Sequence, residues 1–248
     1  MYIRREHAEL DLSTLHQFVR QYPLGLFTTS IPNPKYATLQ TTHIPFVLDT
    51  VEDDPENKGR LRAHIARANP QTKAMIDSIL HSEDDQLEEE VLILFNAPVH
   101  SYITPKFYTE SKPVHGKVVP TWDYAAVQVY GRAKIYHRND ETTGSFLQQQ
   151  VEDLTREGEA SMLQRSGKEG MEAAWKVSDA PRKYVDLHKK GIIGMEITIE
   201  RIEGRFKLSQ EASDGDWRGV VNGFKALGTD EGDKMAQMVE ERGSKRGS

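Results

Sequence analysis

Alternating apolar and polar positions predict a β-strand over Ala126–His137. Val127, Val129 and Ile135 fall on one face of this strand, and most residues between them are polar. Because successive side chains of a strand point to opposite faces, the apolar set predicts the side that faces the core. This segment has the clearest strand pattern in the chain.

Other segments are rich in β-branched and apolar residues and are also expected to be strands. They are Leu24–Ser30, Ala37–Leu48, Arg60–Ala66, Val91–Phe95 and Gly191–Gln210. Turns join the first three, which predicts an antiparallel meander. Within the last segment, Glu203 and Gly204 predict a tight turn and therefore a hairpin.

Apolar residues at helical spacing predict helices around these strands. The expected helices are Glu6–Tyr22, Gln71–Leu80, Asp140–Glu159 (capped by Asp140), Gly167–Lys176, Pro181–Lys190 and Ser213–Leu227. Asn96–Tyr124 is dense in proline, aromatic residues and histidine, and is expected to be a long, functional irregular segment. The fold class is therefore mainly β with peripheral α-helices (α+β). One domain is expected over residues 1–228, followed by a charged, frayed tail over 229–248.

Composition narrows the possible chemistry. The 248 residues include no cysteine, which excludes disulfides, thiolate zinc sites and a cysteine nucleophile. The net charge is -6 and basic residues are dispersed, which argues against general nucleic-acid binding. The first residues lack a secretory pattern and no apolar stretch is long enough to span a bilayer, so a cytoplasmic location is expected, with the nucleus as the alternative.

Sequence motifs exclude several common sites. There is no Gly-x-Ser-x-Gly elbow, no G-x-G-x-x-G and no phosphate-binding P-loop. His43, His64, His100 and His115 do not have the spacing of metal ligands, so no metal site is predicted. A haem needs only one histidine ligand, and haem therefore stays an alternative.

Polar clusters occur in or after predicted strands. Thr42 and His43 form one cluster, and His64 with Arg67 and Asn69 forms another. Arg67 offers a planar fork of donors near backbone N–H groups that the strand leaves unpaired, so an anion such as phosphate can bind there. With Trp122 and Tyr124 as aromatic walls, these clusters supply what a flavin mononucleotide (FMN) site requires.

Several motifs resemble the PaiB-like, FMN-binding negative transcriptional regulator family, in the family's order and over most of the chain. They are PLGLFTTS (23–30), THIPFVL (42–48), AHIARANP (63–70), SYITPKFY (101–108), HGKVVPTWDY (115–124), DAPRKYVD (179–186) and GIIGMEITIERIEGRFKLSQ (191–210). The resemblance implies a split β-barrel of the pyridoxamine-phosphate-oxidase type. It also implies a homodimer that binds FMN in clefts between its subunits. No membrane partner is expected, because no apolar stretch is long enough to span a bilayer.

The resemblance also implies the site residues. The residues expected to bind FMN are Thr42, His43, His64, Arg67, Asn69, Trp122, Tyr124, Lys207 and Gln210. Arg67 and Asn69 would hold the phosphate and ribityl end, and Lys207 and Gln210 would close the cleft. No catalytic residue is assigned; Tyr124, Asp123 and His64 are the options for an acid or base.

Two departures from the family pattern concern this site. Asp123 and Glu211 stand where the family has asparagine, so each replaces an amide by a carboxylate. A carboxylate facing the phosphate would repel it. The first interpretation is an FMN-dependent oxidoreductase-like flavoprotein with an unknown small-molecule substrate. The alternatives are a PaiB-type transcriptional regulator, and a cofactor-free or haem-binding member that uses the same dimer cleft.

Overall fold

The computed structural model describes residues 1–50, 58–80, 84–166 and 173–243 of the chain. The contacts divide it into two compact units. Unit 1 comprises residues 1–18, 95–128 and 203–248, and unit 2 comprises residues 19–94 and 129–202. Most of the acidic loop expected over Val51–Gly59, and part of the loop expected over His81–Glu90, lie outside the described residues.

An antiparallel sheet forms the centre of unit 2. Its strands are β2 (Leu24–Ser30), β3 (Leu39–Pro45), β4 (Val47–Asp49), β5 (Arg60–Ala66), β6 (Val91–Asn96), β8 (Thr121–Tyr136) and β9 (Ile192–Lys207). They are ordered β3-β2-β6-β8-β9-β5-β4. The last residues of β6, the first half of β8 and the end of β9 belong to unit 1. The long alternating strand is confirmed, and it begins five residues earlier than predicted.

The expected meander is present, but its middle strand is divided in two. Residues up to Pro45 form β3, which pairs with β2 and places Thr42 opposite Phe27. Residues after Phe46 form β4, which pairs with β5 and places Leu48 opposite Leu61. Phe46 is buried at the division, so the chain changes partner strands where its side chain enters the core.

Helix α4 (Glu141–Ser166) is tied to β5 by a buried charge network within unit 2. Arg62 Nη2 lies 2.8 Å from Oδ2 of Asp153, and Arg62 Nε lies 2.6 Å from Oδ2 of Asp49. Arg62 Nη1 also donates to Oε1 of Gln150 at 3.3 Å. Because a buried guanidinium requires such partners, this network fixes α4 on the outer face of β5.

The other helices of unit 2 are short. They are α2 (Pro70–Ser78), the 3-10 helix η3 (Val177–Asp179) and α5 (Arg182–Lys189). Asp140 accepts the N–H of Thr143 at 2.8 Å, which confirms the predicted cap of α4. The helix predicted over Gly167–Lys176 is wrong for its described part, because residues 173–176 are not helical.

Unit 1 contains short strands and most of the terminal helices. These elements are η1 (Arg5–His7), β1 (Ala8–Glu9), α1 (Leu12–Gln21, whose last residues belong to unit 2), β7 (Ser101–Ile103), η2 (Pro105–Phe107), α3 (Ser111–His115), α6 (Asp214–Lys225) and α7 (Asp230–Gly243). The helix predicted from Glu6 therefore begins only at Leu12, after Asp11 accepts the N–H of Thr14. The segment Asn96–Tyr124 is also more regular than predicted.

The hairpin predicted over Gly191–Gln210 is wrong, because β9 continues through the expected turn. Gly204 lies opposite Glu9 of β1, and Arg205 lies opposite Ala8. A Cβ atom at Gly204 would lie 2.4 Å from Cδ2 of Leu15. Glycine here allows close packing against Leu15 and does not mark a turn.

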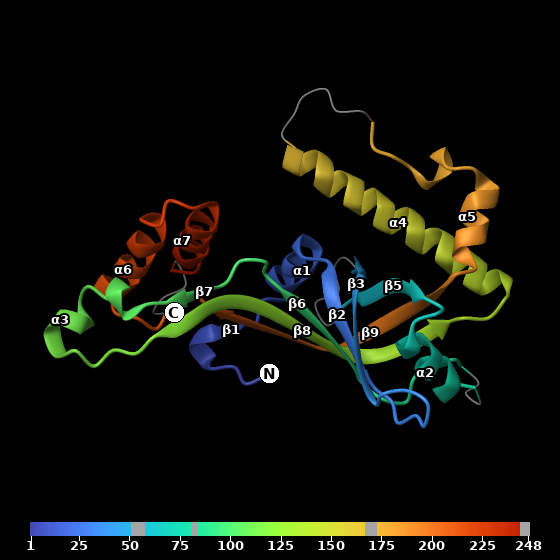
Figure 1. Cartoon of the computed structure of the whole chain (residues 1–248), viewed down its shortest axis with the longest axis horizontal. Helices are drawn as coiled ribbons and strands as arrows, with labels where there is room; N and C mark the ends of the chain where they lie inside the picture. The colour runs from blue at the N-terminus through green and yellow to red at the C-terminus, as the bar shows by residue number, and fades with distance from the viewer. Residues whose placement is uncertain (51–57, 81–83, 167–172, 244–248) are drawn as a thin grey trace. The chain divides into compact units, whose positions relative to one another are not determined.

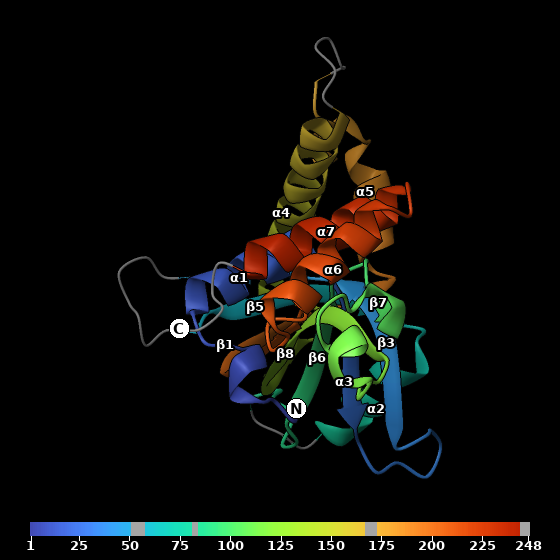
Figure 2. The same cartoon turned by 90° about the vertical axis from the view of Figure 1, so that its left-hand side faces the viewer.

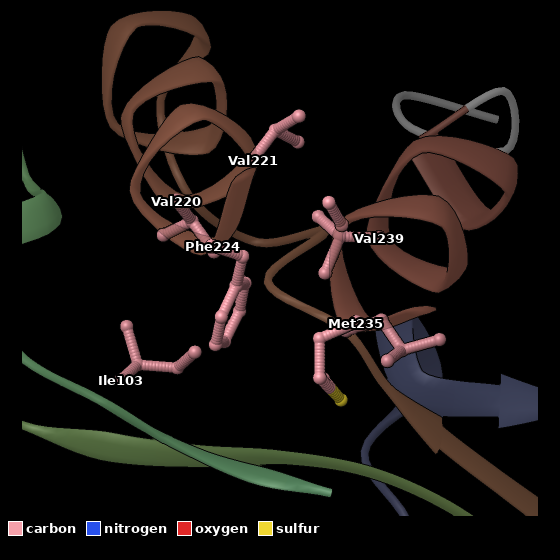
Figure 3. Packing of buried hydrophobic residues seen from close by; sticks show 8 residues of the cluster. Ile103, Val220, Val221, Phe224, Met235 and Val239 are labelled. Atoms are coloured by element: carbon pink, nitrogen blue, oxygen red, sulfur yellow. The ribbon is translucent and has the colours of Figure 1, made fainter. Parts of the chain in front are cut away.

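Residues 230–243 of the predicted tail form α7, which packs against α6 (Figures 1 and 2). The cluster between them is apolar and buried, and Figure 3 shows Phe224 pointing toward Ile103. Its members are Ile103, Leu208, Val220, Val221, Phe224, Met235, Ala236 and Val239. Burial of this face explains why a charged segment forms an ordered helix.

Candidate functional site

The predicted site residues fall into two groups, one in each unit. Unit 2 contains Thr42, His43, His64, Arg67 and Asn69, which we call the strand-end group. Unit 1 contains Trp122, Tyr124, Lys207 and Gln210. The geometry of each group is described separately.

Asn69 and Thr42 meet in one hydrogen-bond network at the start of α2. Asn69 is the N-cap residue, and its Oδ1 accepts the N–H of Gln71 at 2.9 Å. Asn69 Nδ2 donates to Oγ1 of Thr42 at 3.1 Å, and Thr42 Oγ1 donates to Oε1 of Gln71 at 2.6 Å. The sequence therefore identified two partners that the fold does bring together.

Gln71 connects this network to the sheet, and the sequence analysis missed it. Its Nε2 lies 3.1 Å from each of three acceptors, which are Phe27 O, Thr29 Oγ1 and Gln40 O. The side chain is buried, so these bonds satisfy an amide that would otherwise be costly to bury. The Asn69-Pro70 pair is a typical helix start and was the one local signal for this arrangement.

Arg67 is the cation of the strand-end group. Its Nη2 donates to the carbonyl oxygen of His137 at 3.0 Å, and its own N–H bonds the carbonyl of Gly191 at 2.8 Å. Among the described residues, no carboxylate forms an ion pair with Arg67, whereas Arg60 and Arg62 both pair with Asp49. The guanidinium thus keeps donors for an anion, three residues before α2 begins.

The two histidines of the strand-end group differ in environment. His43 is exposed on β3. His64 is half-buried on β5, and burial lowers the pKa of its imidazole. Its Nδ1 is buried and has no hydrogen-bond partner among the described residues. Burial therefore favours the neutral imidazole of His64, which retains one unsatisfied polar atom.

Trp122 and Tyr124 line a pocket of about 550 Å³ in unit 1, which we call the aromatic pocket. Its other lining residues are Asn96, Ala97, Pro98, His100 and Ala125. The Trp122 side chain is 52% exposed, and its ring centroid lies 5.8 Å from that of His100. A pocket of this size with exposed ring faces suits a planar aromatic ligand.

Lys207 lies behind the aromatic pocket. Its Nζ donates to Trp122 O at 2.8 Å and to Thr121 Oγ1 at 2.9 Å, and it lies 3.5 Å from Oδ1 of Asp123 and 3.8 Å from Oε1 of Glu211. Gln210 instead closes its own turn, because Oε1 accepts the N–H of Leu208. Neither role was expected from the sequence.

The two carboxylates that depart from the family pattern both lie beside Lys207. Asp123 is fully buried, and burial raises the pKa of its carboxyl to about 6, although the Ser209 hydroxyl and Lys207 oppose this. Partial burial also raises the pKa of Glu211, but its own N–H, His7 and Lys207 outweigh this and hold that pKa below its ordinary value. The Glu211 charge is therefore stabilised inside the unit, whereas burial outweighs the partners of the Asp123 carboxylate.

Comparison with known proteins identifies the class. Residues 1–201 match the family model described as "Putative FMN-binding domain". The match covers most of the chain, and the chain belongs to this family of FMN-binding domains. With the antiparallel sheet and its peripheral helices, this confirms the expected fold class and FMN as the cofactor that the family indicates.

Relatives support the same assignment. The chain is 50% identical over 251 residues to an uncharacterized protein of Emericella nidulans, with 98% of each chain covered. It is 25% identical over 242 residues to the protease synthase and sporulation protein PAI 2 of Bacillus subtilis, again with 98% of each chain covered. The resemblance to PaiB-like proteins is thereby confirmed.

A solved structure similar to this chain is the flavocytochrome Anf3 of Azotobacter vinelandii. It is 13% identical with a TM-score of 0.45, and the alignment covers 83% of this chain and 72% of that one. Within the described ranges, no helix is both long and apolar enough to cross a membrane.

Proposed function

We propose that this chain is an FMN-binding flavoprotein whose strand-end group binds the FMN phosphate. The observation that carries the proposal is Arg67, a cation at the end of β5 that no carboxylate neutralises among the described residues. A guanidinium binds phosphate through two parallel N–H bonds, which gives both charge and orientation. Asn69 and Thr42 shape the turn that presents it, and the unsatisfied Nδ1 of His64 and the exposed His43 offer further polar contacts.

Taken by itself, the aromatic pocket of unit 1 supports the binding of a planar ring. Trp122 and Tyr124 provide the walls, and Lys207 and Gln210 hold the end of β9 behind them. Bound FMN supplies hydride-transfer and one-electron chemistry, so the proposed activity is that of an oxidoreductase with a small-molecule substrate. The chain's own residues bind and orient the flavin.

We expect the protein to act as a homodimer. Strand β3 lies at one end of the strand order, and its side chains at Thr41 and His43 are exposed. An open strand edge is a common place for a second chain to associate. Size-exclusion chromatography with light scattering measures the mass directly, and a monomer at all concentrations would contradict this part of the proposal.

The phosphate assignment is tested by titrating the apoprotein with FMN and with riboflavin. Replacing Arg67 by alanine should weaken FMN binding about 10- to 100-fold, because a charge-assisted hydrogen bond is lost. Riboflavin lacks the phosphate, so its affinity should not change. Arg60→Ala is the matched control, since Arg60 lies at the other end of β5 but pairs with Asp49 and Glu196. Equal FMN affinity in the wild type and Arg67→Ala would remove Arg67 from the site.

A second candidate function is transcriptional regulation through DNA. The observation that favours it is that Arg182 and Lys183 of α5 and its C-cap residue Lys190 are exposed. Contacts from these cations to phosphates would make binding fall steeply with salt. Fluorescence anisotropy with duplex DNA tests this: Arg182→Ala with Lys183→Ala should weaken binding and flatten the salt dependence. Absence of binding at low salt would reject it.

A further inference from the structure

A charged cluster contacts the backbone of the aromatic pocket at Trp122 in unit 1, and we call it the Lys207 cluster. It consists of Asp123, Lys207, Ser209 and Glu211. Asp123 and Ser209 in it are buried, the Lys207 side chain is 12% exposed, and Glu211 is exposed. The Lys207 ammonium is shared between the two carboxylates and the carbonyl oxygen of Trp122. Ser209 donates its hydroxyl hydrogen to Oδ2 of Asp123 at 2.7 Å. The cluster therefore connects the end of β9 to β8 at the residue that forms the pocket wall.

The backbone geometry is unusual at the same place. Ser209 has a φ of 57°, a left-handed conformation that costs energy for a residue other than glycine. The Ser209 side chain is buried, and its hydrogen bond to Asp123 offsets the energy of this backbone conformation. Alternation along β8 places Asp123 on the opposite face from Trp122 and Tyr124. Asp123 thus lies beneath the pocket wall and not inside the pocket.

We propose that Asp123 and Lys207 are positioning residues for the aromatic pocket, because their ion pair fixes the backbone of Trp122 and so the ring face offered to a planar ligand. The role in flavin binding rests on the function proposed above. The contact by which Lys207 restrains the Trp122 backbone does not depend on a bound ligand.

The physical reason is the need of a buried ammonium for a counter-charge. The Lys207 side chain is 12% exposed, and Asp123 is the nearer of its two carboxylates. If Asp123 becomes neutral, Lys207 retains only Glu211, which also serves His7 at 3.1 Å. The ammonium then gains by moving toward water, and its bonds to Trp122 O and Thr121 Oγ1 are lost.

Protonation is one way to make Asp123 neutral. The groups that face its carboxyl are Lys207, Ser209 and Glu211, and the phenol of Tyr108 is close enough to respond to its charge. The pKa near 6 means that Asp123 gains a proton as the pH falls through the mildly acidic range. The hold on Trp122 should therefore weaken below about pH 6.

The first measurement follows Trp122 alone. Trp175→Phe and Trp217→Phe leave it as the only tryptophan of the chain, and His100→Gln removes the imidazole whose ring centroid lies 5.8 Å from that of Trp122. Its emission should change between about pH 7.5 and pH 5.5 in this background, following Asp123 protonation. With Asp123→Asn added, the same range should show no transition. Asp216→Asn is the matched control, because Asp216 is also buried but accepts backbone N–H bonds of Glu110 and Ser111, and the Trp122 transition should persist.

The second measurement is FMN affinity at the same two pH values. Between the higher and the lower pH, the FMN affinity of the wild type should fall about tenfold more than the FMN affinity of Asp123→Asn falls. This difference corresponds to the loss of one charge-assisted hydrogen bond. The comparison with Asp123→Asn is needed because a phosphate monoester also titrates near pH 6. Asp216→Asn should behave as the wild type.

The outcomes separate this inference from the proposed function. A Trp122 transition that disappears in Asp123→Asn supports the positioning role, even if FMN binds to neither protein; in that case the flavin proposal alone fails. A flat Trp122 signal in the wild type, or a transition that persists in Asp123→Asn, overturns the positioning role even where FMN binds well.

Discussion

Arg242 on α7 and Glu9 on β1 form a buried ion pair, with 2.5 Å between Nη1 and Oε2. The guanidinium also donates to the carbonyl oxygen of Ala8 at 2.8 Å. The two residues are 233 positions apart in the sequence, and both lie in unit 1. This pair fastens the last helix to the short strand that extends the sheet beside Gly204.

Removing one partner of this pair should be costly. Arg242→Met leaves the Glu9 carboxylate buried, so the free energy of unfolding should fall by about 3–5 kcal/mol. Urea denaturation followed by circular dichroism measures this. The exposed pair Lys225–Glu240 is the control, and Lys225→Met should cost less than about 1 kcal/mol. Equal small losses in both variants would show that the buried pair does not stabilise the fold.

Acid should weaken the contact between α4 and β5. Burial raises the pKa of Asp153, but hydrogen bonds from Gln149, Arg62 and Arg156 outweigh this and hold it below its ordinary value. A lowered pKa means that this carboxylate stabilises the fold above its ordinary pKa and loses that contribution as the pH falls below about 4. Arg62→Met should lower stability at neutral pH and show a smaller further loss in acid. An unchanged acid profile would contradict this assignment.

The contribution of Asp123 to stability should change with pH in the opposite direction to that of Asp153. Its pKa is raised to about 6, so its protonated form favours the folded state, and this contribution is lost as the pH rises through that value. Asp123→Asn should therefore gain stability relative to the wild type by about 3 kcal/mol between pH 4 and neutral pH. Denaturation at both pH values measures the difference. A constant difference would show that the buried carboxyl titrates normally.

Asn69 separates the stability of α2 from its proposed ligand role. Asn69→Ala loses the N-cap bond and should cost about 1 kcal/mol of unfolding free energy. Asn69→Asp keeps a capping oxygen but loses the Nδ2 bond to Thr42, so its stability should be no higher than that of the wild type. It also adds a negative charge close to Arg67 in the chain, and FMN should bind more weakly while riboflavin is unaffected. Unchanged FMN affinity in Asn69→Asp would argue against a phosphate at this turn.

Local signals predicted several elements correctly. The strand Leu24–Ser30 has the predicted bounds, and the cap at Asp140 is present. These features depend on near neighbours, namely alternation of side chains and a bond from a side chain to the third N–H after it. The prediction of a hairpin at Gly204 was wrong because glycine allows both a tight turn and the close approach of another residue. Only the position of Leu15 in the fold distinguishes these two cases.

The candidate site was predicted in part. Thr42 and Asn69 do meet, but the sequence does not show that Gln71 joins them, because its three acceptors come from two different strands. The sequence likewise identifies Asp123 and Glu211 as departures from the family pattern. It does not show that both lie beside one lysine.

The sequence by itself determined the family, the strand-rich composition and the residues available for binding, since these follow from residue order and local periodicity. Tertiary structure decided which charges are compensated. Among the described residues, Arg67 forms no ion pair with a carboxylate, whereas Arg62 forms ion pairs with Asp49 and Asp153. The two arginines nevertheless lie within one short segment. The reason is that an ion pair forms only within a few ångströms, and the fold, through strand pairing and the placement of α4, sets those distances.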